Sequence, residues 1–214
     1  MYRMILSTQW KWTRGIVLLA TILGFALPLA SLQSASGAST AADFVARMQR
    51  FGAWYALLAA GIGLMVALTA WAHDQRGRHV YALTLPVSRA QYVLMRLTAG
   101  LAFLLPPAFA VLLGALLVTL FGAIPPALTA YPIALTLRFL FAACVAYALF
   151  FAIGSATQKT AGIILGAVAS VLLAQYVLAL VDVDVDLFER VVDTLFSSPG
   201  VLSIFTGRWS LVDA

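Results

Sequence analysis

The sequence predicts an all-α polytopic membrane protein with about five transmembrane helices. Hydrophobic residues make up 63% of the 214 residues and charged residues only 10%, whereas a soluble domain carries about a quarter charged residues. Such a chain lacks the polar surface that a soluble globule needs. The 13 Lys and Arg residues cluster at the ends of apolar runs, where charges set membrane topology. The net charge of +5 therefore does not indicate a nucleic-acid partner.

The chain begins with a weakly amphipathic stretch, residues 1–14, whose polar residues recur at helical spacing. Its basic and tryptophan content is typical of a helix in the membrane interface, and a frayed tail is the alternative. The apolar run 15–33 that follows is predicted to be the first span, near the lower length limit for a crossing. A cleaved signal peptide is the competing interpretation, although the run is longer than a usual signal core.

The remaining spans follow from the apolar runs and their breaks. Aromatic residues crowd the start of the second run and mark its end, as in an interfacial belt, and residues 41–50 look helical before it. A later uncharged stretch is too long for one crossing, and the prolines and glycine within 122–132 break it. The predicted spans after the first are 51–72, 90–121, 132–156 and 160–181.

Small residues mark two expected helix contacts. Gly61 and Gly63 lie in mid-span without the strand and third glycine of a dinucleotide loop, so close helix packing explains them better. Gly162 and Gly166 form a GxxxG motif in the fifth span. Such a motif lets helices approach closely, either within the subunit, which we favour, or between subunits.

Counting basic residues predicts the orientation. With the amino terminus in the cytoplasm, eight basic residues fall in cytoplasmic segments and five outside, as the positive-inside rule requires. The charged segment 73–96 is then cytoplasmic. The tail 187–214 is expected outside as short helices, because its apolar pieces are too short to span. We expect a multi-pass protein of the plasma membrane with its carboxyl terminus outside.

The charged segment 73–96 carries a recognisable motif. Its residues are Asp74, Arg76 and Gly77, then Leu85, Pro86, Val87, Ser88 and Arg89, then Tyr92 and Arg96. This motif resembles the membrane subunits of ABC exporters of the type-two permease family.

The resemblance implies that 1–14 is an elbow helix and that the loop 73–89 forms a coupling helix. This helix would dock on a separate ATP-binding subunit, and two permease subunits, identical or homologous, would enclose a substrate path. The family has a sixth span, and we expect that span to be missing here, truncated, or supplied by a partner. The residues expected to dock are Asp74, Arg76, Gly77, Arg78, Tyr81, Leu85, Pro86 and Arg89.

The local chemistry of the segment agrees with a short docking helix. Gly77 permits a bend after the second span, and Pro86 separates a helix at about 78–84 from the third span. Ser88 is placed to cap the helix that starts near Arg89. The alternative is a loop whose arginines bind anionic lipid headgroups.

Two polar residues inside the spans are candidates for a translocation path, because such residues are costly in lipid. Arg138 lies about 9 Å by helix rise from Pro132 and either snorkels to the outer interface, which we favour, or faces an inner cavity. Gln175 lies in the fifth span, where a hydrogen bond between helices is the alternative.

Several kinds of chemistry are missing from the sequence. No Walker-type GxxxxGK[ST] motif and no nucleophile elbow occur, and two histidines in the charged segment lack a third metal ligand. We expect no enzymatic activity, no metal and no cofactor on this chain, with ATP and Mg²⁺ on the partner subunit. The function that the resemblance implies is that of an exporter permease. The alternative is a membrane scaffold that recruits a cytoplasmic partner without transport.

Overall fold

The structure is a computed structural model, and it describes residues 2–76, 88–155, 163, 166, 170, 187–197, 200, 202–206 and 209–213. The chain divides into two compact units. The first comprises Met1–Phe151 and Arg208–Ala214, and the second comprises Ala152–Gly207.

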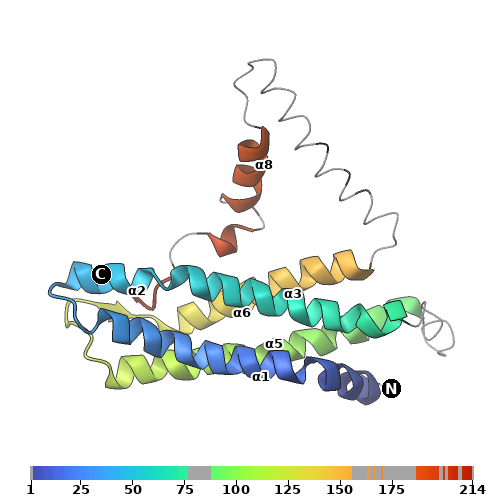
Figure 1. Cartoon of the computed structure of the whole chain (residues 1–214), viewed down its shortest axis with the longest axis horizontal. Coiled ribbons are helices and arrows are strands. Elements are labelled where there is room, and N and C mark those ends of the chain that lie inside the picture. Colours follow the sequence, from blue (N-terminus) through green and yellow to red (C-terminus); the bar gives the residue numbers. More distant parts are fainter. Residues whose placement is uncertain are drawn as a thin grey trace. The chain divides into compact units, whose positions relative to one another are not determined.

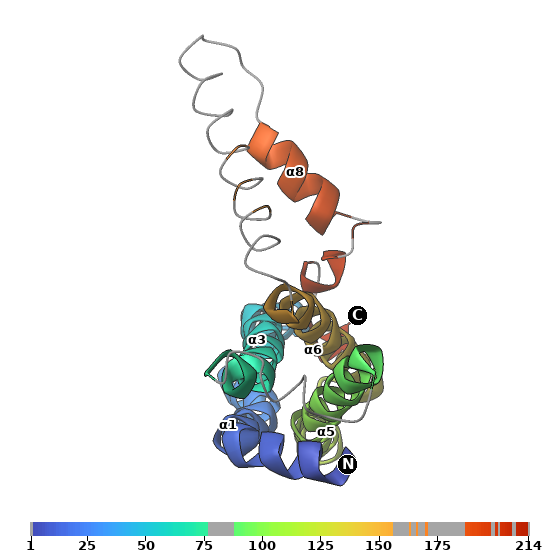
Figure 2. The ribbon, with the colours of Figure 1, turned by 90° about the vertical axis from the view of Figure 1, so that its right-hand side faces the viewer.

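Four long helices dominate the first unit, with the last turn of α6 assigned to the second unit (Figure 1). Among the described residues, four helical stretches are long and apolar enough to cross a membrane. Figure 2 shows the helices around a common axis, with α1 between α3 and α5. This arrangement fits a multi-pass all-α membrane protein. The helices are α1 (Tyr2–Ala35), α3 (Gly52–Arg76), α5 (Arg89–Phe121) and α6 (Pro132–Ser155).

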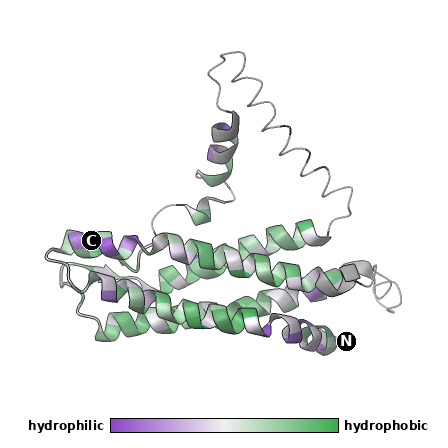
Figure 3. Ribbon diagram, viewed as in Figure 1, coloured by the Kyte–Doolittle hydropathy of each residue, from purple (hydrophilic) through white to green (hydrophobic). Residues whose placement is uncertain are grey.

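The hydropathy of the residues differs between the long helices and the ends of the bundle (Figure 3). Hydrophobic residues cover most of the length of the four long helices, and hydrophilic residues gather on α2 (Ala41–Gln49) and near the start of α1. Many of the apolar side chains are exposed, among them Leu57, which is 63% exposed, and Leu120, which is 73% exposed. In lipid such an exposed apolar surface carries no penalty.

The helix boundaries have identifiable causes. Ser88 caps α5, because its side chain accepts a hydrogen bond from the Gln91 amide at 3.3 Å. α5 ends at Phe121 and α6 begins at Pro132, where the glycine and prolines of the intervening segment predicted the break. Thr40 caps α2 in the same way, accepting from the Asp43 amide at 3.2 Å.

α1 is one continuous helix, so the structure has no break between the expected interfacial helix 1–14 and the first span. One face of α1 is buried along its whole length, in steps of three or four residues that keep it on a single side. Most members of this face are small, which lets neighbouring backbones approach closely. They are Gln9, Thr13, Val17, Ala20, Gly24, Pro28, Ser31 and Ala35.

Glycines permit the closest helix contacts. A Cβ atom at Gly24 of α1 would lie 3.1 Å from the Pro107 carbonyl oxygen, and one at Gly114 of α5 would lie 2.6 Å from the Phe25 carbonyl oxygen. A Cβ atom at Gly63 of α3 would lie 2.7 Å from the Ala143 carbonyl oxygen on α6. The close helix packing that the sequence predicted for Gly61 and Gly63 therefore occurs at Gly63.

The two ends of the four-helix bundle differ. The loop end carries the last turn of α3 and the first turn of α5. The strand end carries two short strands, β1 (Thr129–Ala130) and β2 (Val212–Asp213), which pair antiparallel. The Tyr131 amide also donates to the Leu211 carbonyl at 2.8 Å. Residues 209–213 are thus extended chain, where the sequence predicted short helices.

The described residues of the second unit include one helix and one helical turn. α8 (Leu187–Phe196) and the short η1 (Ser203–Phe205) lie in the tail where the sequence predicted short helices. The Leu202 amide donates to the Leu195 carbonyl at 2.9 Å, and the Thr206 hydroxyl donates to the Phe196 carbonyl at 2.8 Å. These bonds fold the turn back on the end of α8.

Candidate functional site

The predicted docking residues lie at or beyond the described part of the loop end. Asp74 and Arg76 lie in the last turn of α3, and Arg89 is the first residue of α5; the structure describes their backbone only. Five others lie outside the described residues, and their role stays a prediction. These are Gly77, Arg78, Tyr81, Leu85 and Pro86.

Arg96 is the central described residue of the loop end. It lies seven residues into α5, about 10 Å along the helix axis, and is half-buried. Its guanidinium donates a hydrogen bond to the Ala70 carbonyl of α3. It also lies over two aromatic rings, 5.4 Å from the centroid of Trp71 and 4.9 Å from that of Tyr92. Each such cation–π contact contributes about 0.5–2 kcal/mol, more when water is excluded.

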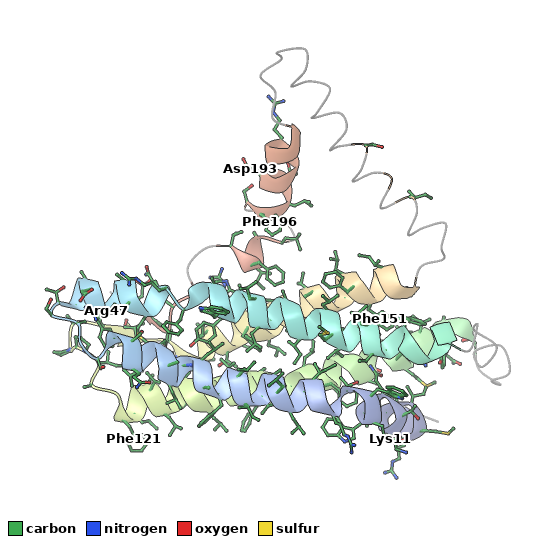
Figure 4. The ribbon with its side chains drawn as sticks, viewed as in Figure 1. Lys11, Arg47, Phe121, Phe151, Asp193 and Phe196 are labelled. Carbon is green, nitrogen blue, oxygen red and sulfur yellow. The ribbon has the colours of Figure 1, made fainter. Side chains whose placement is uncertain are left out.

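Tyr147 on α6 completes the cluster. Its ring is fully buried, and its hydroxyl donates to the Arg96 carbonyl oxygen at 3.2 Å. A Cβ atom at Gly100 of α5 would overlap this ring, so the glycine is what lets Tyr147 reach the α5 backbone. Phe151 lies one turn further along α6 (Figure 4). Its ring is tilted against those of Tyr147 and Trp71, with centroids 5.5 Å and 5.1 Å away.

α1 adds a polar layer at the same end. The Gln9 side chain is 6% exposed and lies beside the Tyr147 hydroxyl. Neither of its amide atoms makes a hydrogen bond of ordinary geometry with a described residue. The hydroxyls of Thr13 on α1 and Thr69 on α3 are 3.2 Å apart and hydrogen-bonded. By contrast, Lys11 points away from the bundle (Figure 4).

Arg138 lies on α6, two turns from its start at the strand end. Its guanidinium is 4.8 Å from the centroid of the Trp209 ring. Trp209 is 3% exposed and packs against Gly52, where a Cβ atom would lie 3.0 Å from the Trp209 carbonyl oxygen. Arg138 therefore contacts the carboxyl-terminal segment, a partner that the sequence did not suggest.

The other predicted site residues are less informative. Gly162 and Gln175 lie outside the described residues. At Gly166 a Cβ atom would meet no described atom within 4 Å. An open apolar groove of about 180 Å³ between α1 and α3 is lined by leucines, isoleucines, Gly61 and Met65; it offers no polar group that would recognise a specific ligand.

Sequence reasoning missed the cluster around Arg96. The motif included Tyr92 and Arg96, but the sequence predicted no contacts for them. The partners Trp71 and Tyr147 come from other helices, so no spacing along the chain connects them. One signal was available: an arginine two turns inside an apolar helix needs buried partners in lipid.

Comparison of the chain with protein-family models, with curated proteins and with solved structures finds no match in any of the three.

Proposed function

We propose that the chain is a membrane-spanning permease subunit of an ATP-driven ABC exporter. It would couple ATP hydrolysis on a separate nucleotide-binding subunit to the movement of a substrate across the membrane. The observation that carries this proposal is the charged motif, whose docking residues run from Asp74 in the last turn of α3 to Arg89 at the first residue of α5, two helices that are long and apolar enough to cross a membrane. A soluble partner on one side of the membrane would bind a motif in that place.

The local structure at the described ends of α3 and α5 supports the proposal. The Ser88 cap fixes the start of α5, and Arg96 bonds α5 to the carbonyl of Ala70 on α3. A docking segment needs rigid attachment points, because a loosely held loop cannot pass force from a partner to the spans. Both attachment points meet that requirement.

The test uses the full chain, co-expressed with an ABC-type ATPase subunit and purified as a complex. We expect Arg76→Glu and Arg89→Glu to weaken the complex by about tenfold or more, because a reversed charge opposes a complementary surface. Co-purification on a tag placed on the ATPase, followed by ATP hydrolysis by the purified sample, measures the effect. The matched control is Arg50→Glu, an exposed arginine at the strand end.

The outcomes separate the two functional hypotheses. Loss of the complex with the loop-end variants, and its retention with Arg50→Glu, would support docking. An unchanged complex with normal ATP hydrolysis in both loop-end variants would overturn the docking residues. A stable complex whose soluble partner hydrolyses no ATP would favour the scaffold.

A further inference from the structure

One pair of residues at the loop end links three of the long helices. Arg96 of α5 bonds the Ala70 carbonyl of α3, and its own carbonyl accepts the hydrogen bond of Tyr147 from α6. The fourth helix, α1, is joined to α3 in the same half of the bundle, where the hydroxyls of Thr13 and Thr69 are 3.2 Å apart and hydrogen-bonded. The set Arg96, Ala70, Trp71, Tyr92 and Tyr147 is called the arginine joint below.

The joint uses properties that arginine alone combines. The planar guanidinium stacks on the rings of Trp71 and Tyr92 while an N–H at its edge donates to a carbonyl. A lysine ammonium carries charge but has no plane to stack and no fixed fork of donors. Exchange of Arg96 for lysine would therefore keep the charge and loosen the geometry.

The packing around Tyr147 leaves little room for independent movement. Gly63 on α3 and Gly100 on α5 both lie so close to the Tyr147 region of α6 that a Cβ atom at either would collide with it. Packed elements with no free volume move together or not at all. A displacement of α3 and α5 at the loop end must therefore carry α6 with it.

We infer that Arg96 and Tyr147 are positioning residues that make the loop end move as one body, so that force applied at the motif reaches α6 and α1 as well as α3 and α5. This inference rests on the proposed function and deepens it, since it names the contacts through which docking acts on the bundle. Neither residue belongs to the docking set. Their replacement should leave binding of the ATPase intact and remove its effect on the strand end.

The experiment measures a distance at the strand end in the complex with the ATPase. In a Cys144→Ala background, spin labels are attached at Leu57→Cys on α3 and Ile133→Cys at the start of α6, both highly exposed. The distance between the labels is recorded without nucleotide and with ATP trapped. The variants tested are Arg96→Met, Arg96→Lys and Tyr147→Phe. The matched control is Arg14→Met, an exposed arginine in the loop-end half of α1.

We expect the parent protein and Arg14→Met to show an ATP-dependent change of distance. Arg96→Met should bind the ATPase normally, keep the nucleotide-free distance and lose the change. Tyr147→Phe and Arg96→Lys should reduce it, and they serve as the test if Arg96→Met does not fold. If the folded variants keep the full ATP-dependent change in label distance, the role inferred for the arginine joint is wrong, while the proposed function is unaffected. A parent protein that binds no ATPase, or shows no change with ATP, would overturn the proposed function itself.

Discussion

Each end of the bundle has an arginine over a tryptophan ring, but the contact joins helices at one end and holds a chain segment at the other. At the loop end, Arg96 on Trp71 ties neighbouring helices to one another. At the strand end, Arg138 on Trp209 holds a segment from the far end of the chain against α6 and the start of α3. The same contact therefore opposes relative movement of helices in one place and detachment of a segment in the other.

The difference also appears in the hydrogen bonds. The described bonds between helices at the loop end come from side chains, with a hydroxyl pair and a guanidinium. At the strand end, backbone groups pair between β1 and β2 and between Tyr131 and Leu211. Side-chain contacts can exchange partners without unfolding, whereas a strand pair must separate as a unit. A single substitution can therefore remove one contact at the loop end, whereas the strand pair responds as a whole.

The largest effect is expected from removal of Trp209. Trp209→Ala deletes a large side chain that is 3% exposed and leaves Arg138 without its ring, so we expect a loss of about 3–5 kcal/mol in the free energy of unfolding. Denaturation by dodecyl sulfate in mixed micelles, followed by circular dichroism, measures it. The control is Trp54→Ala, because Trp54 is 58% exposed and should change stability by about 0.5 kcal/mol or less. Equal losses in both variants would contradict this description of the strand end.

A smaller effect should separate two neighbouring glycines of α3. Gly63→Ala places a Cβ atom 2.7 Å from α6 and pushes away the part of α6 that carries Tyr147, at a cost of about 1–3 kcal/mol. Gly61→Ala meets no atom within 4 Å and should stabilise the helix by up to about 1 kcal/mol, the ordinary gain of alanine over glycine. The same unfolding assay gives both values. Changes of the same sign would refute the close contact of α3 with α6.

The smallest effect concerns the helix caps, one at each end of the bundle. Ser88→Ala and Thr40→Ala should each cost about 1 kcal/mol, because each removes the acceptor for an amide in the first turn. Ser88→Asp keeps that acceptor and should restore most of the loss. Hydrogen exchange of the Gln91 and Asp43 amides reports each cap separately. If exchange at Gln91 is no faster in Ser88→Ala, the cap does not hold the start of α5.

The sequence predicted most of the helical framework because the signals are local. The Ser88 cap and the helix start at Pro132 each depend on a few adjacent residues, and the helix at 41–50 shows a period visible within its own length. The structure agrees with all three. The Thr40 cap was available to the same reasoning, since Thr40 and Asp43 have capping-box spacing.

The contacts that build the candidate site could not be predicted in the same way. β1 and β2 are two residues long and far apart in sequence, so neither shows a period. Arg138 was expected either to snorkel or to face a cavity, and its contact with Trp209 depends on how the chain returns to the bundle. Similarly, Tyr147 can approach Arg96 only because Gly63 on α3 and Gly100 on α5 have no side chain that would collide with it.

The length of α1 has a consequence for the lipid around it. Its 34 residues rise about 51 Å, whereas the hydrocarbon layer of a bilayer is about 30 Å thick. An upright α1 must therefore extend beyond the acyl chains, and a tilted one must lean to fit. The charged side chains of α1 all belong to its first turns, Arg3, Lys11 and Arg14, so the excess falls there. The buried Gln9 and Thr13 lie in the same turns, so their polar side chains are enclosed in the part of α1 that exceeds the thickness of the acyl layer.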